Sequence, residues 1–354
     1  MSAISLLPSV PQSSAPGMSP FRLINEQRPT LEVEQRWHPG PVLRPSLSGA
    51  AGVRAVHVTD ELGYPGQPPL ALEQSKDGKT RHVVLYSDTA DRLEEELDSQ
   101  CEALRAVQVN PWVDSFPAAE EIQAETGRVV ERLAARGVDC HLTIRGMIHP
   151  KIERLLASCR RHVKLTYRFT TLDRVMQSVL EPLAASPRLR LRQAGGLLDL
   201  GLQVQVALDP LVPGLTDTGV SLQPLLEALA KIGVKQVTVG YVVLRSGTRE
   251  SFLRALEPHG WHDVVLDAFA DGCQLKIGAG GAAWSLSKSR RQRGYATVIA
   301  LAAALGMTVR IGGVTNPDFG PKAEPAPTAP RQRLLPGIQS MNWPSDRVDQ
   351  RLGA

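Results

Sequence analysis

The feature that most constrains the fold of this chain is a regular alternation of short apolar runs with longer segments of helical period. The apolar runs cover residues 53–58, 105–110, 139–144, 162–169, 202–208 and 235–244. In the segments between them, apolar residues recur every three or four positions, and several of these segments end at a glycine (Gly137, Gly201 and Gly233). This repeated strand-then-helix order predicts parallel strands joined by right-handed crossovers.

We therefore predict an α/β fold, a partial TIM-like (β/α)6 barrel that occupies residues 36–315. A last helix at about 285–305 and a strand at 308–312 complete this domain. In folds of this kind, functional side chains gather at the C-terminal ends of the strands.

Both ends of the chain differ from the domain in composition. Residues 1–35 are rich in Ser and Pro without periodicity, and residues 316–354 are dense in Pro. Such compositions cannot offset the entropy of ordering, so we predict a disordered N-terminal arm and a disordered C-terminal tail. Two apolar islands in the tail, Leu334–Leu335 and Met341–Trp343, could contact a protein partner. The alternative is an inert tail.

Charge and cysteine content narrow the class of protein. The formal net charge of +4 is small for 354 residues, so it allows local phosphate contacts without demanding them. The four cysteines (Cys101, Cys140, Cys159 and Cys273) are far apart, which argues against disulfides and zinc fingers and for the cytoplasm. We expect no metal site, and no apolar run approaches the ~20 residues of a membrane span.

Five short motifs occur in a fixed order along the predicted barrel. They are "VDSFPAAE" (113–120), "TIRG" (143–146), "TTLD" (170–173), "LEPLAASPRLRL" (180–191) and "DPLVPGLTD" (209–217). In order and spacing they resemble the radical SAM superfamily, specifically spore photoproduct lyase and the DNA repair photolyase-like relatives. The resemblance covers roughly residues 40–315 and implies a barrel of the radical SAM type. In that family, a [4Fe–4S] cluster cleaves S-adenosylmethionine (SAM) reductively.

The resemblance fails at the residues that would bind this cluster. The family carries CxxxCxxC followed by an aromatic residue near its first strand, and three thiolates hold the irons. Laying this pattern over "SLSGAAGVRAVHV" places the three cysteines at Gly49, Val53 and Val56, with His57 at the aromatic position. Neither a hydrogen atom nor an isopropyl group can ligate iron. We therefore expect no cluster and no other cofactor, while residual SAM binding stays open.

Two acidic residues follow the second predicted strand of the barrel. Asp114 and Glu120 belong to a loop that, in the resembling family, borders the nucleoside pocket, which makes them candidates for ligand binding. The alternative is that they cap and charge the start of the next helix.

Two arginines end neighbouring predicted strands. Arg145 and Arg168 could hold a carboxylate or phosphate between their guanidinium groups, and Asp209, at the end of the fifth strand, could face the same ligand. The alternative for the arginines is salt bridges to Asp173 or Asp209. We expect Asp173 to cap the following helix.

Glu181 and Arg190 lie in one motif and are expected to form a pair within the fold.

The strongest basic cluster is "SKSRRQRG" at 287–294, with Lys288, Arg290, Arg291 and Arg293. At the start of a helix it could expose a cationic patch that binds phosphates or nucleic acid. The alternative is an ordinary solvated face, since no aromatic residues are interleaved for base stacking.

Three hypotheses about function follow. The preferred one is a catalytically degenerate barrel that acts as a binding, scaffold or accessory protein, with partners on its tails or surface. The second is an enzyme that binds SAM or another anionic ligand at Arg145, Arg168 and Asp209. The third is a DNA-repair accessory that contacts nucleic acid through residues 288–293.

Overall fold

The computed structural model describes residues 30–46, 51–59, 80–99, 104–277 and 281–319. Its main element is an eight-stranded sheet in which all neighbouring strands are parallel except β2 and β3. The strand order is β12 (Thr308–Ile311), β9 (Gln236–Tyr241), β8 (Gln203–Leu211), β7 (Val163–Arg168), β6 (Asp139–Ile144), β5 (Ala106–Val109), β3 (Val53–Val56) and β2 (Arg44–Pro45).

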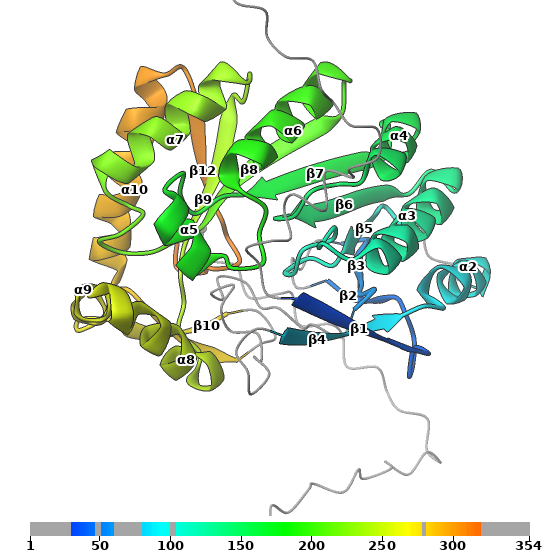
Figure 1. The fold of residues 1–354 in the computed structure, drawn as a ribbon, viewed down its shortest axis with the longest axis horizontal. Helices are drawn as coiled ribbons and strands as arrows, with labels where there is room; N and C mark the ends of the chain where they lie inside the picture. Colours follow the sequence, from blue (N-terminus) through cyan, green and yellow to red (C-terminus); the bar gives the residue numbers. More distant parts are fainter. Residues whose placement is uncertain (1–29, 47–50, 60–79, 100–103, 278–280, 320–354) are drawn as a thin grey trace, which may run out of the picture. The chain divides into compact units, whose positions relative to one another are not determined.

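Helices cover one face of this sheet (Figure 1). They are α2 (Thr89–Ser99), α3 (Glu120–Ala135), α4 (Pro150–Ser158), α6 (Pro187–Asp199), α7 (Gly219–Lys231) and α10 (Lys288–Ala304). A short helix, α5 (Arg174–Leu180), connects β7 to α6. The prediction of an α/β fold with a predominantly parallel sheet is therefore confirmed.

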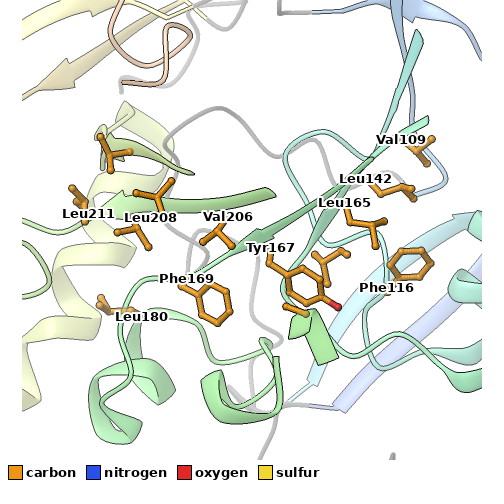
Figure 2. Close-up of a cluster of buried hydrophobic side chains, with 14 of the residues drawn as sticks. Val109, Phe116, Leu142, Leu165, Tyr167, Phe169, Leu180, Val206, Leu208 and Leu211 are labelled. Carbon is orange, nitrogen blue, oxygen red and sulfur yellow. The ribbon is translucent and has the colours of Figure 1, made fainter. Parts of the chain in front are cut away.

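Alternation along most of β7 separates an apolar face from a more polar one. In β7, Val163, Leu165 and Tyr167 are fully buried, whereas Lys164 and Thr166 are only half-buried. Figure 2 shows Leu165 and Tyr167 within the apolar cluster that the helices cover. Strands buried on both faces would read as continuous apolar runs, so this alternation marks a sheet with one polar face.

The predicted barrel is not closed by the described residues. β2 and β12 are the two edge strands of the large sheet and do not pair with each other. The sequence also left three features unpredicted: a parallel pair of β1 (Thr30–Arg36) and β4 (Thr80–Tyr86), an antiparallel pair of β10 (Cys273–Lys276) and β11 (Ala282–Ser285), and the helices α8 (Ser246–Leu256) and α9 (His262–Ala268). The run "TLEVEQR" of β1 mixes charged residues with single apolar ones, so it carried little strand signal.

Both predicted arm boundaries need correction. Residues 30–35, assigned to the N-terminal arm, belong to β1. At the other end, the first residues of the predicted tail are anchored, because Asn316 is 1% exposed and Asp318 forms an ion pair with Arg291. The rest of both arms, 1–29 and 320–354, lies outside the described residues. No helix in the described part of the chain combines the length and apolar content that crossing a bilayer requires.

Candidate functional site

The residues at or directly after the C-terminal ends of β5, β6, β7 and β8 lie along one edge of the sheet, which we call the carboxyl edge. Ile144 is paired with Tyr167, so Arg145 and Arg168 leave neighbouring strands side by side. Arg168 is paired with Ala207, which brings Asp209 to the same edge. Parallel strands thus gather Arg145, Arg168 and Asp209, as the order of the motifs predicts.

Glu181 lies at the centre of the buried charges on this edge and is 0% exposed. Its carboxylate contacts Nη1 of Arg145, accepts a hydrogen bond from Nη2 of Arg190 at 2.8 Å, and accepts another from Oγ1 of Thr170 at 2.7 Å. Burial alone would raise the pKa of Glu181, but Arg190, Arg145 and these hydrogen bonds outweigh it and lower the pKa to about 2. The predicted pair of Glu181 and Arg190 is confirmed.

Each terminal nitrogen of Arg145 has a partner. Nη1 contacts Glu181, and Nη2 donates to the backbone oxygen of Asp209 at 3.0 Å. The alternative of a salt bridge is therefore correct for Arg145, but its acid is Glu181 and neither Asp173 nor the Asp209 carboxylate. Asp173 instead caps α5 by accepting the N–H of Met176 at 2.7 Å, as predicted.

Arg168 is 8% exposed, and its contacts differ from those of Arg145. Nη1 lies 3.4 Å from Oδ2 of Asp209, Nη2 donates to the backbone oxygen of Pro111 at 3.4 Å, and the guanidinium carbon lies 5.7 Å from the centre of the Trp112 ring. Burial lowers the pKa of Arg168, although Asp209 acts in the opposite direction. For both arginines the structure shows the alternative of salt bridges, to Glu181 for Arg145 and to Asp209 for Arg168.

Three polar atoms of these buried charges have no hydrogen-bond partner. They are Nε of Arg168, Nε of Arg190 and Oδ1 of Asp209. Buried polar atoms are satisfied in the great majority of cases, so such unsatisfied atoms call for a bound water or ligand group.

Asp114 fastens the loop after β5 to the end of β6. One of its oxygens accepts the N–H of Phe116 at 3.1 Å and the N–H of Arg145 at 3.0 Å. The alternative of helix capping is wrong for Asp114, because the residue before α3 is Ala119 and no side chain caps it. Burial raises the pKa of Asp114. A Cβ at Gly146 would overlap the backbone oxygen of Phe116, which explains the glycine of the "TIRG" motif.

The structure places the predicted ligand residue Glu120 away from the buried charges of the carboxyl edge. Glu120 is exposed in the first turn of α3, where it suits the helix dipole and contacts none of the buried charges.

Asn110, which sequence reasoning missed, is 0% exposed with a φ of 47°. Its Oδ1 accepts the N–H of Val58 at 2.9 Å, and its Nδ2 has no partner. The available signal was an asparagine directly after a strand, since Asn tolerates positive φ.

Two of the three positions that were overlaid on the cluster cysteines lie inside a strand. Val53 and Val56 are the first and last residues of β3, and Val56 is 0% exposed in the apolar core. Gly49 lies outside the described residues. The overlay is therefore wrong in register, because a ligating loop follows the C-terminal end of a strand. The sequence nevertheless contains no cysteine before residue 101, so shifting the register supplies no thiolate near β3.

The three described cysteines do not fit an iron–sulfur cluster. Cys140 is buried in the apolar core, and burial raises the pKa of its thiol, which opposes the thiolate that iron requires. Cys159 directly follows α4, and Cys273 begins β10. Across the part of the chain that the structure describes, no group of three or more His, Cys, Asp or Glu side chains could hold a metal ion.

The predicted cationic patch at 288–293 is wrong for Arg291. This side chain is 0% exposed, and its guanidinium donates to the Asp318 carboxylate at 2.6 and 2.9 Å and to Oδ1 of Asn316 at 3.0 Å.

The remaining members of the cluster are not uniformly free either. Arg290 pairs with Asp271 at 2.7 Å, and Lys288 donates to the backbone oxygen of Asp318 at 2.6 Å. Lys288 and Arg293 are both exposed on α10 and match the solvated face of the alternative.

Comparison with known sequences gives distant and partial relatives. No protein-family model matches the chain. An uncharacterised protein of Acidianus two-tailed virus is 26% identical over 158 residues, which are 44% of this chain and 51% of the relative. An uncharacterised protein of Mycobacterium bovis is 27% identical over 173 residues, 48% of this chain and 51% of the relative. The chain thus spans about half the length of the curated relatives it matches.

Comparison with solved structures identifies the fold. Spore photoproduct lyase in complex with dinucleoside spore photoproduct superposes with a TM-score of 0.58 at 12% identity, over 84% of this chain and 86% of that one. A mutant of the same enzyme gives a TM-score of 0.59 at 12% identity, again over 84% and 86%. At this identity the likeness shows a radical-SAM-like fold and nothing further.

Proposed function

We propose that the chain is a binding or accessory protein on a radical-SAM-like fold, which has lost cluster chemistry and uses the carboxyl edge of the sheet as its ligand site. The observation that carries the proposal is that the sequence offers no thiolate ligand near β3. Ligation of a [4Fe–4S] cluster needs several thiolates from one loop, and this chain has no cysteine before residue 101.

The cysteines further along the chain do not replace such a loop. Cys140 is 0% exposed among apolar side chains, with its sulfur 3.7 Å from the backbone oxygen of Val138. Reaching iron would require removing it from the core, and large rearrangements of a packed core are costly.

The carboxyl edge supports a binding role because most of it is already rigid. Glu181 fixes Arg145 and Arg190, and Asp114 fixes the backbone of Arg145. Against this framework, Arg168 and Asp209 retain one unused hydrogen-bonding atom each. A preorganised frame with spare polar atoms suits the recognition of a small molecule.

The test of lost chemistry is anaerobic reconstitution of the full chain with iron and sulfide. An intact spore photoproduct lyase treated in parallel is the positive control. We expect no stoichiometric iron, no visible cluster absorbance and no 5′-deoxyadenosine from SAM under reducing conditions. Stoichiometric iron with a reducible centre, or cleavage of SAM, would overturn the proposal. SAM binding without cleavage is compatible with it.

The DNA-accessory hypothesis has lost its main support. Arg291 is buried against Asp318, and Arg290 is paired with Asp271. A protein partner on the tails concerns residues outside those described, and we propose no residue contacts for it.

A further inference from the structure

A surface pocket of about 490 Å³ lies at the opposite end of the sheet from the carboxyl edge. It is lined by Glu131, Ala134 and Ala135, at the end of α3, and by residues 158–162, at the end of α4 and in the turn before β7. These segments directly precede β6 and β7, so the pocket lies beside the amino ends of the two strands. Its volume is in the usual range for a small-molecule site.

The α3 side of the pocket is negatively charged. Glu131 is exposed there, and its side chain forms no hydrogen bond or ion pair with any described residue. The neighbouring Arg132 does not compensate it, because Arg132 pairs with Glu94 of α2 at 3.1 Å. Arg136, which follows α3, pairs with Asp98 at 2.7 Å. Since the carboxyl end of a helix adds a partial negative charge, this side of the pocket attracts a cation.

The turn after α4 carries the opposite charge. Arg160 and Arg161 are both exposed in this turn. Nη1 of Arg160 donates to the backbone oxygen of Ala157 at 3.5 Å, so this side chain is directed at the end of α4. Within the described part of the chain, the side chain of Arg161 has no hydrogen bond or ion pair. Its guanidinium is therefore available to an anion.

Glu131 and Arg161 line the same pocket without pairing with each other. A ligand with a single charge is attracted by one of these side chains and repelled by the other. A molecule with both charges meets each side chain with its opposite. Exposed ion pairs contribute little individually, so recognition here needs both of them together.

We propose that the pocket between the ends of α3 and α4 binds a small zwitterion of the amino-acid or short-peptide class, whose carboxylate pairs with Arg161 and whose ammonium group pairs with Glu131. The pocket is separate from the carboxyl edge, so this inference does not rest on the proposed function.

Cys159 provides a readout inside the pocket, because its half-buried thiol belongs to the lining. Alkylation of the full chain by iodoacetamide is followed by mass spectrometry, with alanyl-leucine as the probe. N-acetyl-alanyl-leucine lacks the ammonium group, and alanyl-leucinamide lacks the carboxylate. We expect alanyl-leucine to protect Cys159 at concentrations about two- to fivefold lower than either derivative requires. Labelling of Cys273, on β10, should not respond to any probe.

Free leucine distinguishes the two sources of a zwitterion, because both of its charges are carried on one carbon atom. Protection of Cys159 by leucine as strong as that by alanyl-leucine assigns the pocket to amino acids. Protection by alanyl-leucine alone assigns it to peptides.

Arg161→Gln and Glu131→Gln separate the two charges. We expect Arg161→Gln to abolish the advantage of alanyl-leucine over its amide, and Glu131→Gln to abolish its advantage over the acetylated form. Arg154→Gln on α4 and Glu121→Gln on α3, both exposed and outside the pocket, are the matched controls. Both controls should keep the two advantages.

The ranking of the probes in the unmutated chain stands even if a variant fails to fold. Equal protection by the acetylated form or by the amide would overturn the inference of a zwitterion. Absence of Cys159 protection by every probe would overturn it as well. Neither result bears on the carboxyl edge, because failure of the proposed function would be seen separately, as iron incorporation or SAM cleavage.

Discussion

Gly294 of α10 lies directly against the phenol of Tyr241 at the end of β9, so closely that a Cβ at Gly294 would overlap the Tyr241 hydroxyl group. That hydroxyl donates to Oδ2 of Asp217 at 2.7 Å, while Oδ1 of Asp217 accepts the N–H of Gly214 at 2.7 Å. The "DPLVPGLTD" motif is thereby tied to the last helix of the domain. The contact joins segments more than 50 residues apart.

The first prediction concerns this close approach. Gly294→Ala should destabilise the fold by about 1–3 kcal/mol, because a methyl group must displace a ring that is buried and hydrogen-bonded. Gly196→Ala is the control: nothing lies within 4 Å of its added Cβ on α6, and alanine favours the helix by roughly 0.5–1 kcal/mol. Denaturant unfolding measures both. Equal stability of the two variants would contradict the packing described.

The second prediction concerns Glu181. Glu181→Gln removes the carboxylate shared by Arg145 and Arg190 and should cost about 3–5 kcal/mol, since it leaves buried guanidinium charge uncompensated. Glu250→Gln, at an exposed position on α8, should change stability by less than about 0.5 kcal/mol. The free energy of unfolding from urea titrations is the measurement. If Glu181→Gln lowered the free energy of unfolding no more than Glu250→Gln does, the buried network would contribute little to stability.

Glu181 also predicts a dependence on pH. Its pKa falls from the ordinary value of 4.5 to about 2 in the folded chain, so the unfolded state binds the proton more readily. Its stabilisation is complete above pH 4.5 and is lost as the pH falls from 4.5 towards 2. The free energy of unfolding, plotted against pH across this range, should fall more steeply towards low pH in the unmutated chain than in Glu181→Gln. Parallel curves would contradict the lowered pKa.

His57, directly after β3, gives a prediction in a different range of pH. Burial, with smaller contributions from Arg44 and His38, lowers its pKa from 6.5 to about 4. Because the folded pKa is depressed, the contribution to stability is complete above pH 6.5 and is lost as the pH falls towards 4. An NMR titration should find the imidazole neutral near pH 5. Titration at its ordinary pKa would show that His57 is solvated.

The last prediction separates structure from nucleic-acid binding in the basic cluster. Arg291→Gln should destabilise the fold by about 1–3 kcal/mol, because Asp318 and Asn316 lose their donor. Arg293→Gln, two residues further along α10 and exposed, should be neutral within about 0.5 kcal/mol. Thermal unfolding of both variants is the check. Strong duplex-DNA binding that both variants abolish without loss of stability would restore the predicted patch.

Particular residues show how far sequence reasoning reaches. Asp173 was predicted to cap a helix and does, because capping depends on a hydrogen bond to a residue only three positions away. Glu181 and Arg190 were predicted to pair and do, being nine residues apart in one motif. Arg145 was assigned the wrong acid, since its partner is 36 residues away and is brought close only by the turn of β7 into α5.

The alternation of apolar strands and amphipathic helices determined by itself that this chain forms a predominantly parallel sheet with helices on one face, because periodicity along the backbone decides which side of each element is apolar. The absence of cysteine near β3 is likewise a property of the sequence alone. The tertiary structure decided which charges meet. Arg291 is buried, Asp114 binds backbone, and Arg168 and Asp209 keep unused atoms, because these outcomes depend on the distances between segments that only the folded chain brings together.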